Sequence, residues 1–409
     1  MNEWKKVKLK DCCHSISDGD HLPPPKSNSG VPFVTIANID ATNHIDFGNT
    51  MFVPLEYYNS LNDIRKAKCN DILYSVVGSF GKPVLIKENI PFAFQRHIAI
   101  LRPNNEIADS RFLYYVMLSR DFYMQADTVA IGAAQRTISL TALRNMEVKL
   151  PSMETQYRIA SILSRYDSLI ENYQKQIKLL EEAAQRLYKE WFVDLRFSGH
   201  ENTKIVDGVP EGWEKKTIDD VTCKVTTGLN PRKNFVLGKG SNYYVTIKNM
   251  ADNTLFLDDR CDRVDNEALE KINKRSDLKI GDILFSGIGT IGRVALVDIP
   301  TNNWNVSESV FTLRVNDIVT KEFLYLMLLS PDMQNYCQSN AHGAAQKGIR
   351  MADLKAYSFN LPPFGVIQKF TNLVTPTIKK VSSIRNQIRL LTEARDRLLP
   401  RLMNGEIAV

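Results

Sequence analysis

Apolar residues recur at intervals of three and four along two long stretches of the chain. The first stretch runs from Thr155 to Phe197 without proline or glycine, and the second runs from Gln368 to Leu399. This spacing places the apolar residues on one face of an α-helix, and a stripe kept over several heptads is typical of a coiled coil. Pro376 lies early in the second stretch and predicts a kink or a late helix start there.

Outside these two stretches the apolar runs are short and are bounded by glycine and polar residues, as strands are. The clearest predicted strands are Asp71–Tyr74, Val84–Ile86, Ile283–Phe285 and Val294–Val297. Two further segments, Arg111–Leu118 and Glu322–Leu329, have the spacing of short helices. The regions before each long helix are therefore predicted to be mixed α/β.

The chain contains two copies of one unit. Asn70–Lys82 is similar to Gly281–Arg293, which lies 211 positions later. Three shorter matches keep the same offset: Phe112-Leu-Tyr with Phe323-Leu-Tyr, Gly132-Ala-Ala-Gln with Gly343-Ala-Ala-Gln, and Leu150-Pro with Leu361-Pro. Trp4 and Trp213 also correspond, each before a basic run and in a slightly shifted register. Because these matches are collinear, we interpret them as an internal duplication.

These patterns predict an α+β protein that is internally duplicated, with two mixed α/β domains separated by two long helices. The predicted boundaries are 1–150 and 201–361 for the α/β domains, and 151–200 and 362–409 for the helices. A lone amphipathic helix leaves its apolar stripe in water, so we expect the two helices to pair, antiparallel if the copies are related by a pseudo-two-fold axis. A helix of about 40 residues is about 60 Å long, which makes the pair a rigid spacer between two similar heads.

Composition narrows the class of protein. The sequence is 44% hydrophobic and 24% charged, as in globular proteins, and its net charge of +6 is compatible with nucleic-acid binding without requiring it. The six cysteines form no C-x-x-C pair, which argues against a zinc ribbon or a disulfide framework and fits a reducing compartment. No apolar run approaches the roughly 20 residues of a membrane span. We therefore expect a soluble, cytoplasmic protein without a membrane partner.

Catalytic motifs are weak or absent. Gly287-Ile-Gly-Thr-Ile-Gly292 matches a dinucleotide-binding pattern, but that pattern requires a following helix, whereas Arg293–Val297 has the character of a strand. A tight hairpin is the better interpretation. The sequence has no H-E-x-x-H or G-x-S-x-G motif, and Glu147-Val-Lys149 lacks the upstream acidic residue of a metal-dependent nuclease. No catalytic, cofactor-binding or metal-binding residue is predicted.

Both long helices resemble those of a known family. Leu180–Phe197 resembles the central helix of the specificity subunits of type I restriction–modification enzymes, and Leu390–Ile407 resembles their C-terminal helix and tail. The Gly-Asp-Ile-Leu hairpin, the Gly-Ala-Ala-Gln turn and the Leu-Pro before each helix also match. Family members often start each helix with Pro-Pro-Leu-x-Glu-Gln. Here the starts are Pro151–Gln156 and Pro362–Gln368, which keep the Gln but not the position of the Glu.

The resemblance implies a DNA-reading role. Each α/β domain would be a target recognition domain for one half of a bipartite, asymmetric site in double-stranded DNA, and the helices would set the unspecified spacer. Two modification subunits that bind S-adenosylmethionine and methylate adenine would dock on the chain, and two restriction subunits would bring ATP and Mg. The chain itself would bind no cofactor. The alternatives are a coiled-coil scaffold without DNA specificity and an autonomous DNA-acting enzyme.

Candidate DNA contacts are loop residues of the types that read base edges or bind phosphates. In the first domain they are Lys26, Asn28, Ser79, Lys82, Gln95, Arg96, Gln135 and Arg136. In the second they are Asn230, Arg232, Lys233, Lys248, Asn249, Thr290, Arg293, Gln346, Lys347 and Arg350. For any single residue the alternative is an ordinary solvated group.

Residues that both copies share, such as Lys82 and Arg293 or Gln135 and Gln346, are suited to holding the fold or to contacting phosphate. The loops 20–30 and 228–240 differ between the copies, so we expect them to discriminate sequence. Trp4 and Trp213 are predicted to be core anchors. Tyr188 and Trp191 are candidate docking anchors for the modification subunits, since such anchors favour aromatic residues.

Overall fold

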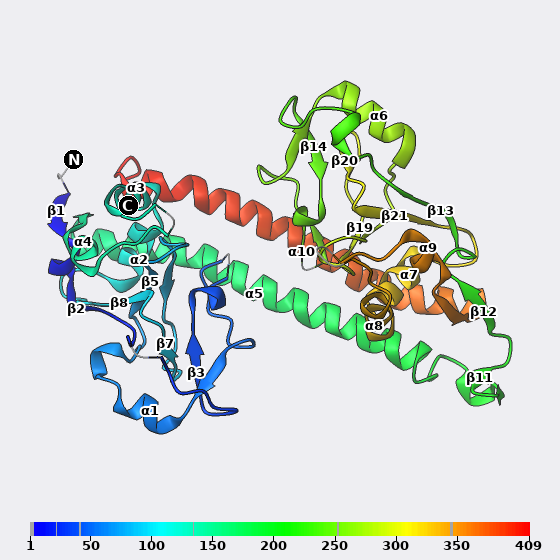
Figure 1. Cartoon of the computed structure of the whole chain (residues 1–409), viewed down its shortest axis with the longest axis horizontal. Helices are drawn as coiled ribbons and strands as arrows, with labels where there is room; N and C mark the ends of the chain where they lie inside the picture. Colours follow the sequence, from blue (N-terminus) through cyan, green and yellow to red (C-terminus); the bar gives the residue numbers. More distant parts are fainter. Residues whose placement is uncertain (1–3, 22, 41, 134, 252, 344–346) are drawn as a thin grey trace. The chain divides into compact units, whose positions relative to one another are not determined.

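A computed structural model of the chain describes residues 4–21, 23–40, 42–133, 135–251, 253–343 and 347–409. The chain forms two compact units, Met1–Asn172 with Ile388–Val409, and Tyr173–Gln387. Each unit contains one α/β domain and a segment of each long helix (Figure 1). We call the two α/β domains head one (residues 4–150) and head two (residues 205–361).

The two long helices are α5 (Met153–Phe192) and α10 (Phe364–Met403), each of 40 residues. Both predicted helices are confirmed, but the late start at Pro376 is wrong, because α10 begins twelve residues earlier. Pro376 cannot donate to the carbonyl of Asn372, four residues before it. Both residues are exposed, so water can solvate that carbonyl and the helix tolerates the proline.

The helices run antiparallel within each unit, as predicted. In the first unit the N-terminal half of α5 shares a core with the C-terminal half of α10, and Asp167 pairs with Arg395 at 2.7 Å. In the second unit the end of α5 meets the start of α10, where the Trp191 and Phe370 rings lie 5.7 Å apart. The apolar stripe of each helix is therefore buried both by the other helix and by a head.

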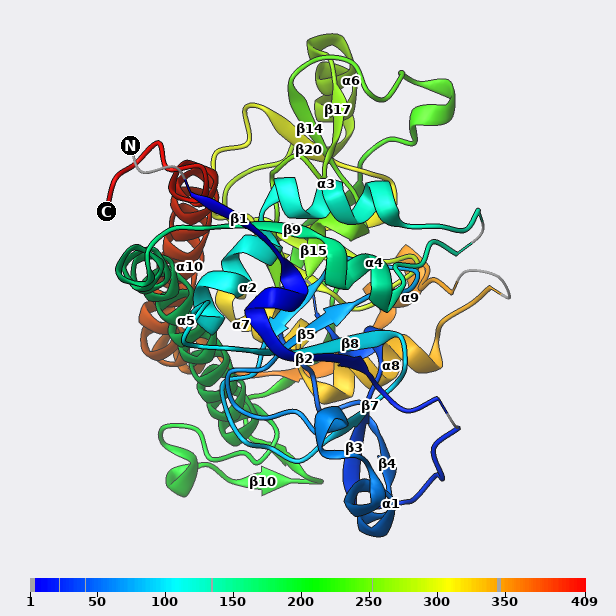
Figure 2. The same ribbon diagram turned by 90° about the vertical axis from the view of Figure 1, so that its left-hand side faces the viewer.

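Head one contains two sheets and a ribbon (Figure 2). The larger sheet has the antiparallel order β2-β8-β5-β6, the smaller has the order β4-β3-β7 with β3 and β7 parallel, and β1 pairs with β9. The strands are β1 (Lys5–Lys8), β2 (Cys13–Asp18), β3 (Val31–Val34), β4 (Met51–Val53), β5 (Ile72–Ser75), β6 (Pro83–Leu85), β7 (Ala93–Phe94), β8 (Ile98–Pro103) and β9 (Glu147–Leu150). The helices are η1 (Leu9–Cys12), η2 (Ile36–Asn38), α1 (Leu55–Ser60), η3 (Asp63–Arg65), α2 (Ser110–Leu118), α3 (Arg120–Val129) and α4 (Leu140–Asn145).

Head two repeats this topology. Its sheets have the orders β13-β21-β18-β19 and β17-β14-β20, with β14 and β20 parallel, and β12 pairs with β22. The strands are β10 (Ile205–Val206), β11 (Val209–Pro210), β12 (Glu214–Thr217), β13 (Thr222–Thr227), β14 (Asn242–Val245), β15 (Met250–Ala251), β16 (Thr254–Leu255), β17 (Asp262–Val264), β18 (Ile283–Ser286), β19 (Val294–Leu296), β20 (Trp304–Val306), β21 (Val310–Val315) and β22 (Ser358–Leu361). The helices of the head are η5 (Pro231–Lys233), η6 (Ile247–Asn249), α6 (Asn266–Ser276), α7 (Lys321–Leu328), α8 (Pro331–Ser339) and α9 (Met351–Ala356), and η4 (His200–Asn202) precedes the head.

The larger sheet of each head packs against the long helices. In head one, α2 and β5 share a core with Ile159 and Leu163 of α5. In head two, α7 and β18 share a core with Phe370 and Val374 of α10. The smaller sheets have separate clusters of their own. Each head is therefore joined to the helices through its larger sheet.

The start of α5 departs from the expected match between the copies. Gln156 is buried and joins the head to the helix: its amide donates to the carbonyls of Ile107 and Pro151 and accepts from the backbone N–H of Asp109 at 3.0 Å. The repeat offset pairs Gln156 with Ile367, which is also buried, whereas Gln368 is exposed. The correspondence drawn between the two glutamines is therefore wrong, because helix phase decides which residue faces the head.

Candidate nucleic-acid interface

The duplicated glycine-rich motif is a β-hairpin in both heads. In head one the Ser75 hydroxyl donates to the carbonyl of Ser79 at 2.9 Å and accepts from the backbone N–H of Lys82. In head two Ser286 makes the same two bonds with Thr290 and Arg293. Because β18 and β19 pair antiparallel across Gly287–Gly292, the predicted hairpin is confirmed and no helix follows the glycines.

The basic residue after each hairpin turn reaches back to the backbone of its head. The ammonium of Lys82 lies 3.5 Å from the carbonyl oxygen of Ile39, and the guanidinium of Arg293 donates to the carbonyl of Ile247 at 3.0 Å. Both side chains thus hold the hairpin against the segment that contains η2 or η6. That Lys82 and Arg293 contact phosphate stays a prediction. Ser79 and Thr290 are exposed at the hairpin turns.

In each head the hairpin turn is hydrogen-bonded to the residue that follows the Gly-Ala-Ala-Gln motif. In head one the N–H of Gly78 donates to the carbonyl of Arg136 at 2.9 Å, and in head two Gly289 donates to Lys347 at 2.8 Å. The Arg136 side chain pairs with Asp127 and lies over the Phe80 ring, so it braces the turn. Gln135, Lys347 and Arg350 are exposed, and Gln346 lies outside the described residues.

The candidate loops near the smaller sheet of head one are exposed. Lys26 and Asn28 flank Ser27, whose N–H donates to the carbonyl of Phe52 in β4. Arg96 is exposed and Gln95 is partly buried in the turn between β7 and β8. Leu22, within the loop predicted to discriminate sequence, lies outside the described residues.

Two candidate asparagines of head two make hydrogen bonds within the head itself. Asn230 caps η5 by accepting from Arg232, and its amide donates to Glu308 at 2.7 Å. Asn249 is only 2% exposed, and its side-chain oxygen accepts from the backbone of Thr246 at 2.9 Å. The expectation that Asn249 projects from a loop is therefore wrong, since its amide closes the turn around η6.

Three further exposed candidates in head two are charged. Arg232 and Lys233 lie on η5, and Lys248 lies on η6 beside the buried Asn249. Arginine and lysine supply both base-edge and phosphate contacts. That these residues contact DNA remains a prediction.

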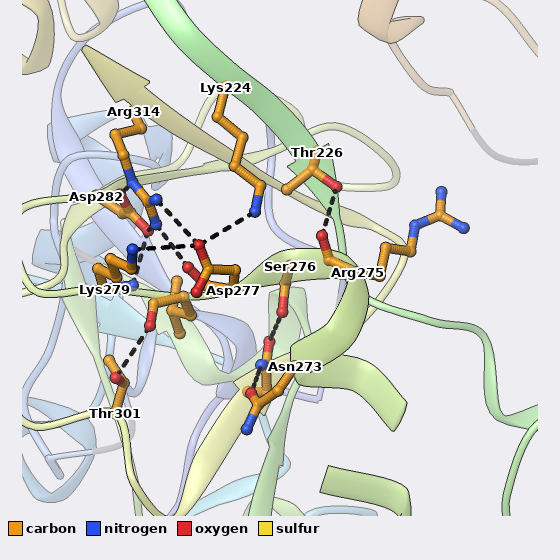
Figure 3. Close-up of polar contacts among 12 residues, drawn as sticks. Lys224, Thr226, Asn273, Arg275, Ser276, Asp277, Lys279, Asp282, Thr301 and Arg314 are labelled. Carbon is orange, nitrogen blue, oxygen red and sulfur yellow. Dashed lines mark hydrogen bonds and ion pairs between the residues drawn. The ribbon is translucent and has the colours of Figure 1, made fainter. Parts of the chain in front are cut away.

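A buried ion pair fixes the strand that leads into each hairpin (Figure 3). Asp282 of the Gly-Asp-Ile-Leu motif is 1% exposed and receives two hydrogen bonds from Arg314, at 2.7 and 2.8 Å. Arg314 also donates to the carbonyl of Asp277, and the pairing with Asp282 raises the pKa of the guanidinium. In head one Arg102 makes the equivalent bonds with Asp71 and the carbonyl of Lys66. The repeated Asp was visible in the sequence, but its Arg partner was not.

Head two concentrates positive charge beside this pair. The carboxylate of Asp277 lies 3.2 Å from Arg314, 3.4 Å from Lys279 and 3.5 Å from Lys224 (Figure 3). These cations, with Arg314 the strongest influence, lower the pKa of Asp277. No local sequence pattern indicates this cluster, because Lys224 and Arg314 lie far from Asp277 along the chain.

Head one is also tied to α5 by a charged contact. A carboxylate oxygen of Glu171 lies 3.0 Å from Nε2 of His44 and pairs with the Lys87 ammonium. The hydrogen bond from His44, followed by the pairing with Lys87, lowers the pKa of Glu171 to about 2. The contact is part-buried, with 23% of the Glu171 side chain exposed.

We expect Glu171→Gln to lower the free energy of unfolding at pH 7 by about 1 kcal/mol, the range of a partly screened ion pair. Because the folded pKa lies below the ordinary value of 4.5, Glu171 contributes its full stabilisation above that value and loses it as the pH falls toward 2. Urea unfolding of both proteins at pH 7 and pH 3.5 measures this difference. An undiminished difference at pH 3.5 would contradict the assignment.

The aromatic residues proposed as docking anchors are part of the core. Tyr188 and Trp191 are each 7% exposed and pack around Phe370. Their predicted role in docking is therefore wrong, because head two itself covers this face of α5. Trp213 is buried in the same core, and Trp4 packs edge-on against Phe112, so the prediction of core anchors is confirmed.

None of the helices among the described residues has an apolar stretch of the length that a membrane span needs. Within the same residues, no three or more His, Cys, Asp or Glu side chains are grouped so that they could hold a metal ion.

Comparison with known proteins matches both halves of the chain. The model of the type I restriction modification DNA specificity domain matches residues 1–182 and 210–388. The MjaIX specificity subunit of Methanocaldococcus jannaschii is 28% identical over 305 residues, covering 73% of this chain and 69% of the relative. The HindI specificity subunit of Haemophilus influenzae is 25% identical over the full length of both chains. A solved S subunit of a type I system from M. genitalium has the same fold, with a TM-score of 0.59 at 18% identity over 98% of this chain and 96% of that one.

Proposed function

This chain belongs to the type I restriction–modification DNA specificity family, and we propose that its two heads each read one half of a bipartite, asymmetric DNA site. The observation that carries the proposal is that the specificity domain matches the chain twice, once over each head. Two copies of one DNA-reading fold in a single chain suit a target with two parts.

The differences between the heads support an asymmetric target. Both heads keep the hairpin, its serine and the buried Asp–Arg pair, which are the parts that hold the fold. Their exposed loops differ: head one presents Lys26 and Asn28, whereas head two presents Arg232 and Lys233. Different side chains recognise different base edges, so the two half-sites would differ in sequence.

The long helices are suited to two tasks. Each has 40 residues, about 60 Å at 1.5 Å per residue, and the pair would set the number of unspecified base pairs between the half-sites. They also carry exposed apolar side chains, among them Leu179 on α5 and Leu373 and Leu390 on α10. Such side chains fit the docking of two modification subunits, which would supply S-adenosylmethionine and methylate adenine. Restriction subunits, with ATP and Mg, would complete the complex.

The function is tested by co-expressing the chain with its modification subunit and mapping methylated adenines across the genome. We expect one bipartite motif with a fixed unspecified gap, and we expect it to disappear when this chain is deleted. Methylation without a motif, or methylation that survives the deletion, would favour a scaffold that has no DNA specificity.

Exchanging residues 22–29 for an unrelated polar loop is expected to change one half of the motif and leave the other half and the gap intact. Lys26 and Asn28 belong to head one, so the exchange leaves the reading loops of head two unchanged. The matched exchange of residues 231–238 in head two should change the other half. Methylation mapping of both variants decides the result, and an unchanged motif in both would contradict the assignment of these loops.

A further inference from the structure

Two loops of head one meet α5 at a single residue, Glu171. His44 lies in the segment between β3 and β4, and Lys87 lies in the segment between β6 and β7. Both side chains contact the Glu171 carboxylate, His44 through Nε2 at 3.0 Å and Lys87 through its ammonium. The His44 loop joins two strands of the smaller sheet, and the Lys87 loop runs from the larger sheet to the smaller one, so the contact lies outside the core that joins the larger sheet to the helices.

The loop that presents His44 is organised by Asp40. The Asp40 carboxylate accepts from the N–H of Thr42 at 2.8 Å, the N–H of His44 at 2.9 Å and the Thr42 hydroxyl at 2.8 Å. Nδ1 of His44 lies 3.0 Å from the Thr42 hydroxyl, and Nε2 donates to Glu171, because an ionised carboxylate only accepts. Glu171 thus lies between the His44 imidazole, which this loop holds in place, and the Lys87 ammonium.

Head two makes a contact at the equivalent position. Asp298 lies 211 residues after Lys87, and Ser382 on α10 lies 211 residues after Glu171. The Ser382 hydroxyl donates to the Asp298 carboxylate. Both copies therefore fasten the same loop to the same place on a long helix, but head one uses an ionic cluster and head two uses a single hydroxyl.

We propose that Glu171 is a positioning residue that holds head one at a fixed orientation on α5, through His44 and Lys87, and so sets the spacing at which this head meets its half-site. The inference rests on the proposed function. The larger sheet already attaches the head, through its core and through the Tyr115 hydroxyl bound to Asp167 at 2.6 Å. A second attachment at Glu171 prevents rotation about the first.

The scale of the effect follows from the geometry of DNA. Successive base pairs are about 3.4 Å apart, so a small rotation of the head moves its reading loops by one base-pair step. Loss of the contact at Glu171 should therefore change which spacer length the complex accepts. It should leave the bases read within each half-site unchanged, because His44, Lys87 and Glu171 are not among the candidate reading residues.

The test uses the complex of this chain with its modification subunits, on duplexes that carry the mapped motif. Methylation rates are measured with the native spacer and with spacers one base pair shorter and longer. We expect Glu171→Lys, which repels Lys87 and leaves Nε2 of His44 without its acceptor, to lower the preference for the native spacer at least tenfold. The double variant Lys87→Glu/Glu171→Lys restores an ion pair of reversed polarity and should recover most of that preference. Glu182→Lys, the same change at an exposed position of the helix, is the control for Glu171→Lys.

The outcomes separate this inference from the proposed function. If the wild-type complex methylates without a bipartite motif, the proposed function fails. If the wild type has a motif but Glu171→Lys keeps the native spacer preference, the positioning role is overturned while the function stands. If Glu171→Lys loses activity on every duplex, the double variant decides: recovery of spacer-selective methylation supports the role, and no recovery overturns it.

Discussion

Gly228→Ala is expected to destabilise head two by about 4 kcal/mol or more, a large share of the about 5–15 kcal/mol by which a folded domain is stable. Gly228 follows β13 and donates its N–H to the carbonyl of Ser307 at 3.2 Å. A Cβ atom on this residue would lie 1.5 Å from the carbonyl oxygen of Val306 and 2.5 Å from its carbon. Both are backbone atoms of the strand beside it, so the clash cannot be relieved by moving a side chain.

Gly365→Ala is the matched control. Gly365 lies near the start of α10, where a Cβ would meet nothing within 4 Å. Alanine is the better helix former, so this variant should be neutral or more stable by up to about 1 kcal/mol. Urea unfolding followed by tryptophan fluorescence measures both, because Trp304 is fully buried in head two. Equal unfolding midpoints for the two variants would contradict the close packing at Gly228.

In the assembled complex, Gly228→Ala should also remove recognition of one half-site. Gly19 occupies the corresponding place in head one, where a Cβ would lie 2.1 Å from the carbonyl oxygen of Phe94. Gly19→Ala should therefore damage head one in the same way. Methylation mapping of the two variants would link each head to its half of the motif.

The second large effect is expected from Asp282→Asn, at about 3 kcal/mol, because it leaves the Arg314 guanidinium without its charged partner. Asp282 is 1% exposed and Arg314 is 22% exposed, so little water can replace the lost carboxylate. Asparagine has nearly the same size as aspartate, so packing is kept. The loss of stability therefore measures the lost charge and hydrogen bonding. The loop from Asp277 to Asp282, which leads into β18 and its hairpin, should loosen first.

Asp259→Asn provides the comparison within the same head. Asp259 also pairs with an arginine, Arg263, at 3.1 Å, but its side chain is fully exposed, so its loss should have almost no effect. The difference between the urea midpoints of the two variants isolates burial as the cause. If both variants unfold at the wild-type midpoint, the Asp282–Arg314 pair does not stabilise the head.

Sequence reasoning succeeded where the information is local or repeated. The three-and-four spacing predicted both long helices, and the glycines bounded by apolar runs predicted the hairpin that follows Ser286. It failed where the packing around a residue, which no sequence pattern shows, decides its environment. Asn249 has the composition of a loop residue, yet it is buried because Thr246 and the surrounding turn enclose it. Tyr188 and Trp191 belong to a helix stripe that the sequence alone leaves open to partners, and they are buried because head two packs against them.

The amino-acid sequence by itself determined the duplication, the two long amphipathic helices and the family, because periodicity and repeated motifs are properties of the chain alone. Only the tertiary structure decided which partner each repeated residue meets. It paired Asp282 with Arg314, buried Gln156 while leaving Gln368 exposed, and brought His44 and Lys87 to Glu171. The physical reason is that burial and ion pairing depend on distances in space between segments that are far apart along the chain, and no local pattern encodes those distances.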